Sequence, residues 1–259
     1  MVERVVISHF YNEAYLLPWW LRHHREIFDH GVLIDYHSTD ESVDICRELV
    51  PNWEIVPSEN TSFAALLCDF EVMKHESRFP DAWKLALNTT EFFVAPGLAK
   101  MERLLLQHDL TGVRLPGAIM VDTEPHIAPD PSQPLTLQKR SGIWEDEMDF
   151  KGLAIPGLTF PTRSRLYHRY KIGAYTPGRH SSHLPRQCNG SRELGSIRWY
   201  GFSPWTDAFK ARKLQISGRR DSFDIKNGFG AQHQADLVEL DGRWSKLTPL
   251  SGILRDAAA

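Results

Sequence analysis

The chain contains little cysteine and no long hydrophobic run. Its three cysteines, Cys46, Cys68 and Cys188, are odd in number and widely spaced in 259 residues. This usage is typical of a reducing compartment rather than of a disulfide framework. No run of about 18 apolar residues occurs, and the first residues lack the cationic and apolar regions of a secretory leader. The composition therefore predicts a soluble, cytoplasmic protein without a transmembrane segment.

The chain also lacks an excess of positive charge. Its formal net charge at neutral pH is -3. Binding to nucleic acid or to an anionic membrane is carried by clustered excess lysine and arginine. We therefore expect no nucleic acid among the main partners.

Apolar patterns in the first third alternate between strand and helix periods. Strands are expected at residues 4–8, 32–35 and 54–57, and helices at 17–28, 38–50 and 63–76. Ser38, with Glu41 three residues later, fits a capping box, so Ser38 is expected to cap the second helix. Strands and helices that alternate at this spacing predict parallel βαβ units and a Rossmann-like sheet.

The segment from Trp83 to Val94 is the stretch around which the rest is organised. An apolar run ends at Asn88-Thr-Thr90 and restarts after Glu91 as Phe-Phe-Val. This pattern predicts a buried strand with a short polar turn at its carboxyl end. In open α/β sheets, ligands bind at that edge.

Four segments of the first 95 residues together resemble the GT-A-type glycosyltransferases of the family-2 kind. They are Val6 to Glu13 (Val-Ile-Ser-His-Phe-Tyr-Asn-Glu), Leu17-Pro-Trp-Trp20 with His23-His24, Asp35-x-x-Ser-Thr-Asp40, and Trp83 followed by Thr90-Glu91-Phe92. The resemblance implies one GT-A-like α/β domain over residues 1–259, with a mostly parallel sheet flanked by helices. Residues 1–95 would form the nucleotide-sugar-binding half, and residues 96–259 the acceptor-side half and a C-terminal extension.

The resemblance also implies the ligands and the residues that bind them. The donor would be a nucleoside-diphosphate sugar and the acceptor a glycan or another hydroxyl compound. Phe10, Asn12 and Glu13 of the first loop and Asp35 at the end of the second strand would hold the nucleoside. Asp69 matches a family position that faces the nucleotide.

The most diagnostic acids of the family are missing here. The family normally has Asp-x-Asp before Glu-Phe, where the aspartates bind a divalent cation, but this chain has Asn88 and Thr90. Magnesium and manganese need hard anionic oxygen ligands. We therefore expect Asn88 and Thr90 to contact the donor, and any metal to be weakly bound or dispensable. Glu91 and His180 are the two ligands that could remain.

A diphosphate leaving group still requires neutralisation of its charge. Gly178-Arg179-His180 matches a Gly-x-His segment that the family often has, within the region richest in arginine and histidine. The resemblance implies that His180 is a metal ligand or a donor to the phosphates. An imidazole together with a guanidinium can neutralise a diphosphate, so we expect Arg179 to share this role. The alternative for such a region is a solvated cationic face.

Two acids are candidates for the catalytic chemistry. Glu91 follows the polar turn and would either contact the acceptor or support the loop. Asp146, in Trp-Glu-Asp-Glu, resembles the Glu-Asp pair whose aspartate is often the base in family-2 enzymes. The alternative for Asp146 is a solvated turn.

An aromatic cluster near the C-terminal third has two interpretations. Trp199, Tyr200, Phe202 and Trp205 surround a glycine and a proline, and could form a platform for a sugar or pack in the core. We expect the core role for at least two of them.

The resemblance implies glycosyl transfer with inversion. The alternative is a non-catalytic protein that binds nucleotide sugars or glycans on the same fold. A sugar-1-phosphate nucleotidyltransferase is disfavoured, because no glycine-rich phosphate loop with an early lysine follows the first strand.

Overall fold

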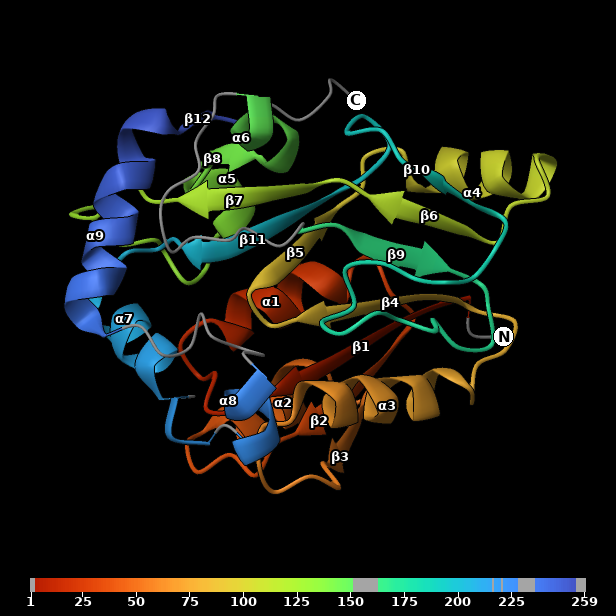
Figure 1. The fold of residues 1–259 in the computed structure, drawn as a ribbon, viewed down its shortest axis with the longest axis horizontal. Helices are drawn as coiled ribbons and strands as arrows, with labels where there is room; N and C mark the ends of the chain where they lie inside the picture. Colours follow the sequence, from red (N-terminus) through yellow and green to blue (C-terminus); the bar gives the residue numbers. More distant parts are fainter. Residues whose placement is uncertain (1–2, 151–162, 216, 220, 228–235, 255–259) are drawn as a thin grey trace.

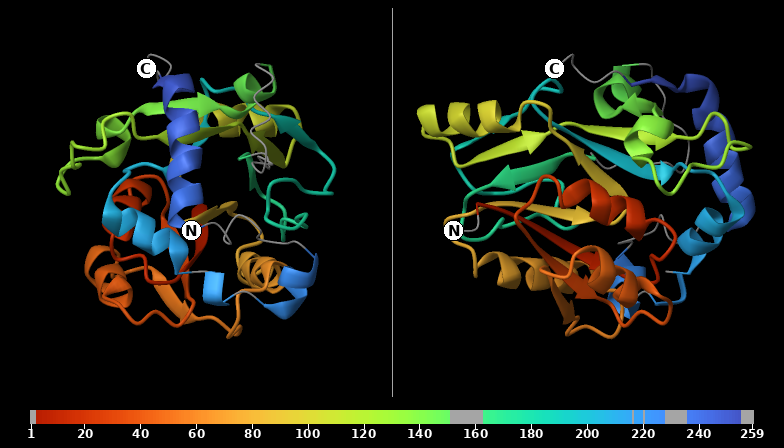
Figure 2. Two further views of the ribbon diagram at one scale, coloured as in Figure 1. Left: turned by 60° about the vertical axis from the view of Figure 1, so that its left-hand side comes forward. Right: turned by 180° about the vertical axis from the view of Figure 1, so that it is seen from behind.

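The computed structural model describes residues 3–150, 163–215, 217–219, 221–227 and 236–254. Within these ranges the chain forms two β-sheets with helices packed around them (Figures 1 and 2). None of the helices in this part of the chain is both long and apolar enough to cross a membrane.

The larger sheet has seven strands in the order β10-β6-β9-β4-β1-β2-β3. Its strands are β1 (Arg4–Phe10), β2 (His30–Asp35), β3 (Glu54–Pro57), β4 (Trp83–Asn88), β6 (Gly112–Leu115), β9 (Arg165–His168) and β10 (Gln187–Asn189). β1 to β4 run parallel, whereas β9 is antiparallel to both β4 and β6. The predicted α/β fold with a GT-A-like, Rossmann-type parallel sheet is confirmed.

The smaller sheet has the order β12-β8-β7-β11-β5. Its strands are β5 (Glu91–Val94), β7 (Gly117–Val121), β8 (Ser141–Trp144), β11 (Ser196–Phe202) and β12 (Gly252–Ile253). β5 pairs antiparallel with β11, while β9 of the later half extends the larger sheet. Both halves of the chain therefore contribute to both sheets.

Helices cover the sheets in the described ranges. They are α1 (Leu17–His24), α2 (Ser42–Leu49), α3 (Ala65–Glu76), α4 (Leu98–Gln107), α5 (Leu135–Gln138), α6 (Glu145–Phe150), α7 (Asp207–Leu214), α8 (Ser222–Asn227) and α9 (Leu237–Leu247), with the 3-10 turns η1 (Ser217–Arg219) and η3 (Thr248–Leu250).

The prediction that Ser38 caps the second helix is wrong. α2 begins at Ser42, and the residue before it makes no side-chain cap. The Ser38 hydroxyl instead accepts a hydrogen bond from the Asn12 backbone N–H at 3.1 Å. Ser38 is therefore used to join two loops at the edge of the sheet.

Alternate residues of the parallel strands face two separate hydrophobic clusters, as the period of a strand requires. Val5 and Ile7 face a smaller cluster with Val72 of α3. Val6 faces the main cluster, which also contains Trp20 of α1. α3 and α1 therefore lie on opposite faces of the sheet.

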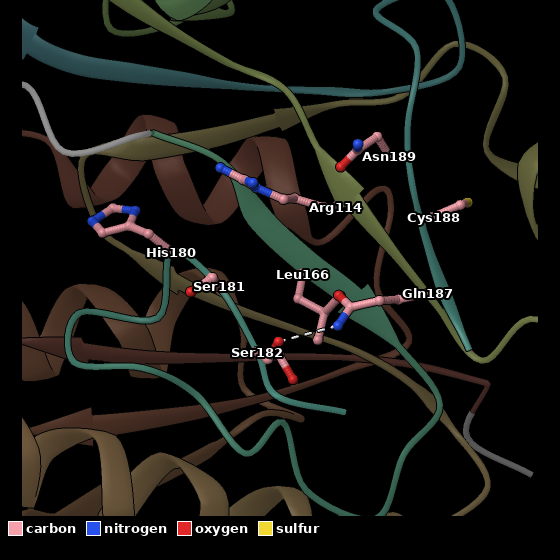
Figure 3. A pocket seen from close by; sticks show the side chains of 8 residues that line it. All are labelled: Arg114, Leu166, His180, Ser181, Ser182, Gln187, Cys188 and Asn189. Atoms are coloured by element: carbon pink, nitrogen blue, oxygen red, sulfur yellow. Dashed lines mark hydrogen bonds between the residues drawn. The ribbon is translucent and has the colours of Figure 1, made fainter. Parts of the chain in front are cut away.

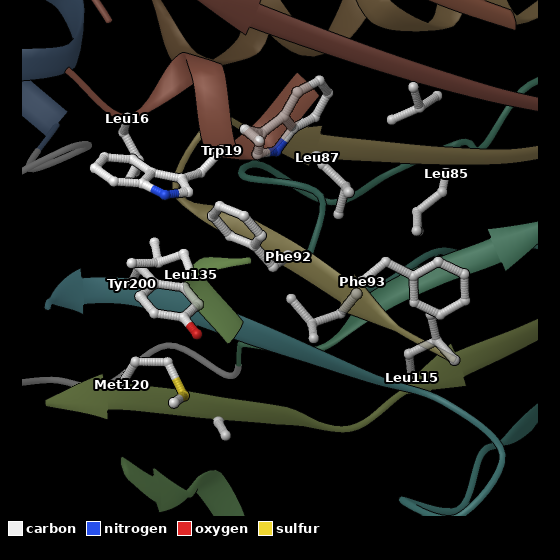
Figure 4. Packing of buried hydrophobic residues seen from close by; sticks show 14 of the residues in the cluster. Leu16, Trp19, Leu85, Leu87, Phe92, Phe93, Leu115, Met120, Leu135 and Tyr200 are labelled. Carbon is white, nitrogen blue, oxygen red and sulfur yellow. The ribbon is translucent and has the colours of Figure 1, made fainter. Parts of the chain in front are cut away.

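β5 carries the main cluster from the larger sheet to the smaller one. Phe92 is fully buried, and its ring centroid lies 4.9 Å from that of Tyr200 of β11. Figure 4 shows Phe92 and Phe93 between side chains from the α1 region, such as Trp19, and side chains from β7 and β11, such as Met120. The polar turn before β5 is thus mounted on a rigid, buried strand.

Glu71 of α3 is a buried acid that holds the segment after β3. Its carboxylate accepts hydrogen bonds from the Ser58 hydroxyl at 2.8 Å, the Glu59 backbone N–H at 2.6 Å and the Asn60 side-chain amide at 3.0 Å, and lies 2.9 Å from His9 Nε2. Burial alone would raise the pKa of Glu71, but hydrogen bonds, those from His9 and the Glu59 N–H first, lower it from 4.5 to about 2.

We expect Glu71→Gln to remove one source of acid sensitivity. Because the folded-state pKa lies below the unfolded value, the ionised carboxylate stabilises the fold fully above about pH 4.5. This stabilisation is lost as the pH falls from about 4.5 to about 2. Urea unfolding across this window should show a flatter pH dependence for Glu71→Gln than for wild type. The exposed Glu48→Gln is the control, and equal slopes for both variants would contradict the assignment.

Candidate active site

The carboxyl ends of three adjacent parallel strands form the edge on which the predicted site lies. In the register of the sheet, Phe10 pairs with Asp35 and His9 pairs with Asn88. The first loop, the acid after β2 and the polar turn after β4 are therefore neighbours, as the sequence predicted.

Asn12 joins the first loop to the loop after β2. Its backbone has a positive φ of 48°, and its Oδ1 accepts hydrogen bonds from the N–H groups of Thr39 at 2.7 Å and Asp40 at 3.3 Å. Asp35 Oδ1 accepts the Ser38 N–H at 2.9 Å. The ring of Phe10 is buried in the core, so its contact with a nucleoside stays a prediction.

Glu13 is buried and forms an ion pair with Arg212 of α7 through both carboxylate oxygens. The backbone N–H of Glu13 donates to the Ser42 hydroxyl at 2.8 Å. The structure thus gives Glu13 a partner from the C-terminal part of the chain, which lies beside the ends of the parallel strands in Figure 1.

Two further C-terminal residues contact the same edge. Gln215 donates from its amide to the carbonyl of Asn12 at 3.0 Å. The guanidinium of Arg219 lies 3.8 Å from the ring centre of Tyr11 and donates to the Tyr36 carbonyl at 2.9 Å. The segment from α7 to η1 therefore covers the nucleoside end of the predicted site.

Glu91 is fully buried and bound by Arg165 of β9. Arg165 Nε lies 2.9 Å from Oε2 of Glu91, and Arg165 NH2 lies 2.6 Å from Oε1. Oε2 also accepts the Asn88 N–H at 2.8 Å. Glu91 therefore supports the turn, which is one of the two roles considered for it. Contact of Glu91 with an acceptor stays a prediction.

Arg179 is the buried cation at the centre of the site. It donates to Asp69 Oδ1 at 2.6 Å and to Asn88 Oδ1 at 2.8 Å. The N–H of Gly178 donates to the second oxygen of Asp69 at 2.8 Å. Burial alone would lower the pKa of Arg179, but the charges of Asp69 and Glu91 outweigh it and raise the pKa. A permanent positive charge therefore lies beside Asn88, the residue at the position of the first family aspartate.

His180 is a neutral imidazole beside this cation. Its Nδ1 lies 3.2 Å from Arg165 NH1 and 3.3 Å from the Ser164 carbonyl. Burial, followed by the charges of Arg165 and Arg163, lowers the pKa of His180 to about 2. Thr90 is 8% exposed, and its carbonyl accepts the Tyr200 N–H at 2.7 Å.

These residues do not fit a divalent cation. Both oxygens of Glu91 are engaged by Arg165, and the same guanidinium faces Nδ1 of His180. In the part of the chain that the structure describes, no group of three or more His, Cys, Asp or Glu side chains is arranged to hold a metal. The expected weak dependence on metal stays a prediction.

Asp146 makes no contact with Glu91, Arg165, Arg179 or His180 among the contacts of the described residues. Its carboxylate is 70% exposed and pairs with Arg192. The neighbouring Glu145 turns inward and accepts the N–H of Arg163 at 2.6 Å and of Gly117 at 3.2 Å. Its role as base also stays a prediction.

The core role expected for at least two of the four aromatics is confirmed. Tyr200, Phe202 and Trp205 are buried in the main cluster. Trp199 is half-buried, and the guanidinium of Arg163 stacks on its ring at 3.6 Å.

The sequence analysis did not predict the role of Arg165. Its position at the start of the apolar strand Arg-Leu-Tyr-His could have indicated this role, because a buried arginine requires an acid partner. The partner lies 74 residues earlier.

No protein-family model matches the sequence, and no curated protein matches it. The fold is similar to crystal structures of S. aureus TarS, at a TM-score of 0.44 and 14% identity over 83% of this chain and 39% of that one. TarS 1-349 gives a TM-score of 0.42 at 13% identity, over 84% of this chain and 65% of that one. TarS 1-349 in complex with UDP gives 0.45 at 15%, with the same coverage. The chain spans less than two thirds of the length of each of these structures.

We expect Glu91→Gln to destabilise the fold by about 3 kcal/mol, because it leaves the guanidinium of Arg165 buried without its counter-charge. The double variant Glu91→Gln/Arg165→Met should recover more than half of this loss, since it removes the stranded charge. Urea unfolding measures both.

The matched control is Asp44→Asn, which breaks an exposed ion pair with Arg47 and should cost at most about 0.5 kcal/mol. A Glu91→Gln variant as stable as this control would show that the buried pair does not fix the turn.

Proposed function

We propose that the chain transfers a sugar, with inversion, from a nucleoside-diphosphate sugar to a hydroxyl group of a glycan or another acceptor. The observation that carries the proposal is the buried guanidinium of Arg179, held between Asp69 and Asn88 at the carboxyl edge of a parallel sheet. A fixed cation beside carboxylate acceptors is what a nucleoside diphosphate requires.

Asp35 is proposed to hold the ribose. Its Oδ1 is used by the Ser38 N–H, while Oδ2 has no hydrogen-bond partner among the described residues. That oxygen is available to accept a ribose hydroxyl. Asn12 keeps the two flanking loops in register, and the pair of Glu13 with Arg212 fixes the first loop from the other side.

Arg179 and His180 are proposed to stabilise the leaving diphosphate. Arg179 supplies the positive charge. Nδ1 of His180 lies near both a donor, Arg165 NH1, and an acceptor, the Ser164 carbonyl. We assign the tautomer in which Nδ1 accepts from Arg165, so that Nε2 carries the ring proton and can donate to a phosphate oxygen. Such preorganised donors act most strongly where water is excluded.

Asp146 is proposed as the base. The acceptor oxygen loses its proton to the carboxylate while it attacks the anomeric carbon, and the nucleoside diphosphate leaves from the opposite face. Arg192 orients this exposed carboxylate. In this scheme Glu91 is a positioning residue that shapes the turn.

The competing function is non-catalytic binding of nucleotide sugars or glycans on the same fold. It is favoured by one observation, the engagement of both Glu91 oxygens by Arg165. Turnover separates the two functions, because a transferase given only water as acceptor slowly releases nucleoside diphosphate.

We expect Asp35→Asn to weaken nucleoside-diphosphate binding about 10- to 100-fold, the loss of one or two charge-assisted hydrogen bonds. The amide oxygen can still accept the Ser38 N–H, so the fold should persist. Calorimetric titration measures the affinity, and Asp81→Asn, exposed at the amino end of β4, is the control. An unchanged affinity in Asp35→Asn would remove Asp35 from the donor site.

We expect the release of nucleoside diphosphate from a panel of donor sugars to be similar in excess chelator and in millimolar manganese. The reason is that Arg179 supplies the charge that a metal would supply. Arg179→Ala should lose turnover under both conditions. Asn88→Asp/Thr90→Asp restores two carboxylates and should gain dependence on manganese.

A wild type that turns over only with manganese would refute the metal-independent mechanism. Tight binding of several donors without turnover under any condition would favour the binding protein over the transferase.

A further inference from the structure

A small polar pocket lies on the far side of the candidate site from the nucleoside edge. It has a volume of about 260 Å³ and is lined by Arg114, Leu166, His180, Ser181, Ser182, Gln187, Cys188 and Asn189. Its strands, β6, β9 and β10, follow β4 in the larger sheet, whereas β1 and β2 lie on the other side of β4. Figure 3 shows the Arg114 side chain extending toward the side where His180 lies.

The charge of this pocket is positive and uncompensated. Arg114 donates through Nε to the Ser164 hydroxyl at 2.8 Å, which is a neutral partner. Its terminal nitrogens have no hydrogen-bond or ion-pair partner among the residues that the structure describes. By contrast, the guanidinium groups of Arg165 and Arg179 are each paired with a buried carboxylate. None of the eight lining residues is an acid.

One neutral side chain adds hydrogen-bond donors to the pocket. The side-chain amide of Asn189 has no partner in the described ranges. The amide of Gln187 already donates to the carbonyls of Ser182 at 3.1 Å and Leu184 at 2.6 Å, so it only lines the wall. A guanidinium fork with a neutral amide donor and no competing acid is suited to bind a carboxylate or a phosphate group.

The pocket is connected to the proposed leaving-group site. The Ser164 hydroxyl, which accepts from Arg114, donates to the His180 carbonyl at 3.1 Å. His180 itself lines the pocket and neighbours Arg179. A group bound here would therefore lie beyond the diphosphate, on the side of the transferred sugar and the acceptor.

We propose that this pocket binds an anionic group, a carboxylate or a phosphate, carried by the sugar substrates, with Arg114 as its specificity-determining residue. The assignment of the anion to a substrate rests on the proposed function; the binding of an anion does not. The anion belongs either to the acceptor or to the transferred sugar, and the chemistry of recognition is the same for both.

Direct titration provides the readout for this pocket. Cys188 lies between Gln187 and Asn189 on β10, and its side chain points away from theirs, so its thiol is not used (Figure 3). We expect inorganic phosphate, glycerol 3-phosphate and glucuronate to bind saturably in calorimetric titration, and glycerol and glucose to show no binding.

In Arg114→Gln, the dissociation constant for phosphate should rise about tenfold or more, the loss of one charge-assisted hydrogen bond. The matched control is Arg103→Gln, which removes the same charge from the exposed face of α4 and should behave as wild type. Equal affinity in Arg114→Gln and wild type, or no binding of phosphate to wild type, would overturn the proposal.

Saturating nucleoside diphosphate separates the pocket from the site of Arg179. Binding of phosphate that persists under this condition supports an independent pocket, and binding that disappears overturns it. A nucleoside-diphosphate uronic acid that by itself displaces phosphate from the pocket would assign the anion to the donor sugar. Displacement only by acidic acceptors added to the nucleoside diphosphate would assign it to the acceptor. The titration needs no turnover, so a failed transferase assay leaves this result unaffected.

Discussion

The buried pair of Arg165 and Glu91 is the interaction on which the candidate site depends. It joins β9 to the first residue of β5, and the same carboxylate accepts the N–H of Asn88, so one acid fixes both ends of the turn. Taking two charges out of water costs several kcal/mol for each ion, which is offset only when hydrogen bonds satisfy the partners. The pair is therefore a device that fixes geometry more than a source of stability.

The geometry that this pair fixes is the placement of a second guanidinium. With the turn held, the Asn88 side chain accepts from Arg179, which also donates to Asp69 of α3. At an effective dielectric constant of about 20, one charge about 4 Å from another is worth roughly 4 kcal/mol. One guanidinium carries half the charge of a divalent cation, and a single carboxylate, that of Asp69, pairs with it. Neutral Asn88 and Thr90 are thus compatible with the proposed binding of a diphosphate.

The sequence predicted the strand ends well, because hydrophobic alternation fixes which residues reach the edge of a parallel sheet. The pattern alone placed Asp35 and Asn88 at the carboxyl ends of their strands. The pairing of charges could not be predicted, since Glu13 meets Arg212 from 199 residues away and only the packed fold brings them together. The prediction that Ser38 caps a helix was wrong for a related reason. A serine before a helix can satisfy either a helix N–H or a neighbouring loop, and the tertiary contact with Asn12 decided it.

The contacts of the C-terminal segment have a consequence for how the donor is selected. Gln215 and Arg219 bind the backbone of the first loop and of Tyr36, and Arg219 stacks on Tyr11. The first-loop backbone and the ring of Tyr11 belong to the half that the family resemblance assigns to the nucleoside. A base that enters this edge must therefore fit against side chains from both ends of the chain. If the proposed function holds, selectivity for the base would depend on Gln215 and Arg219 as much as on the Rossmann-like half, whereas the phosphates would meet the cluster around Arg179.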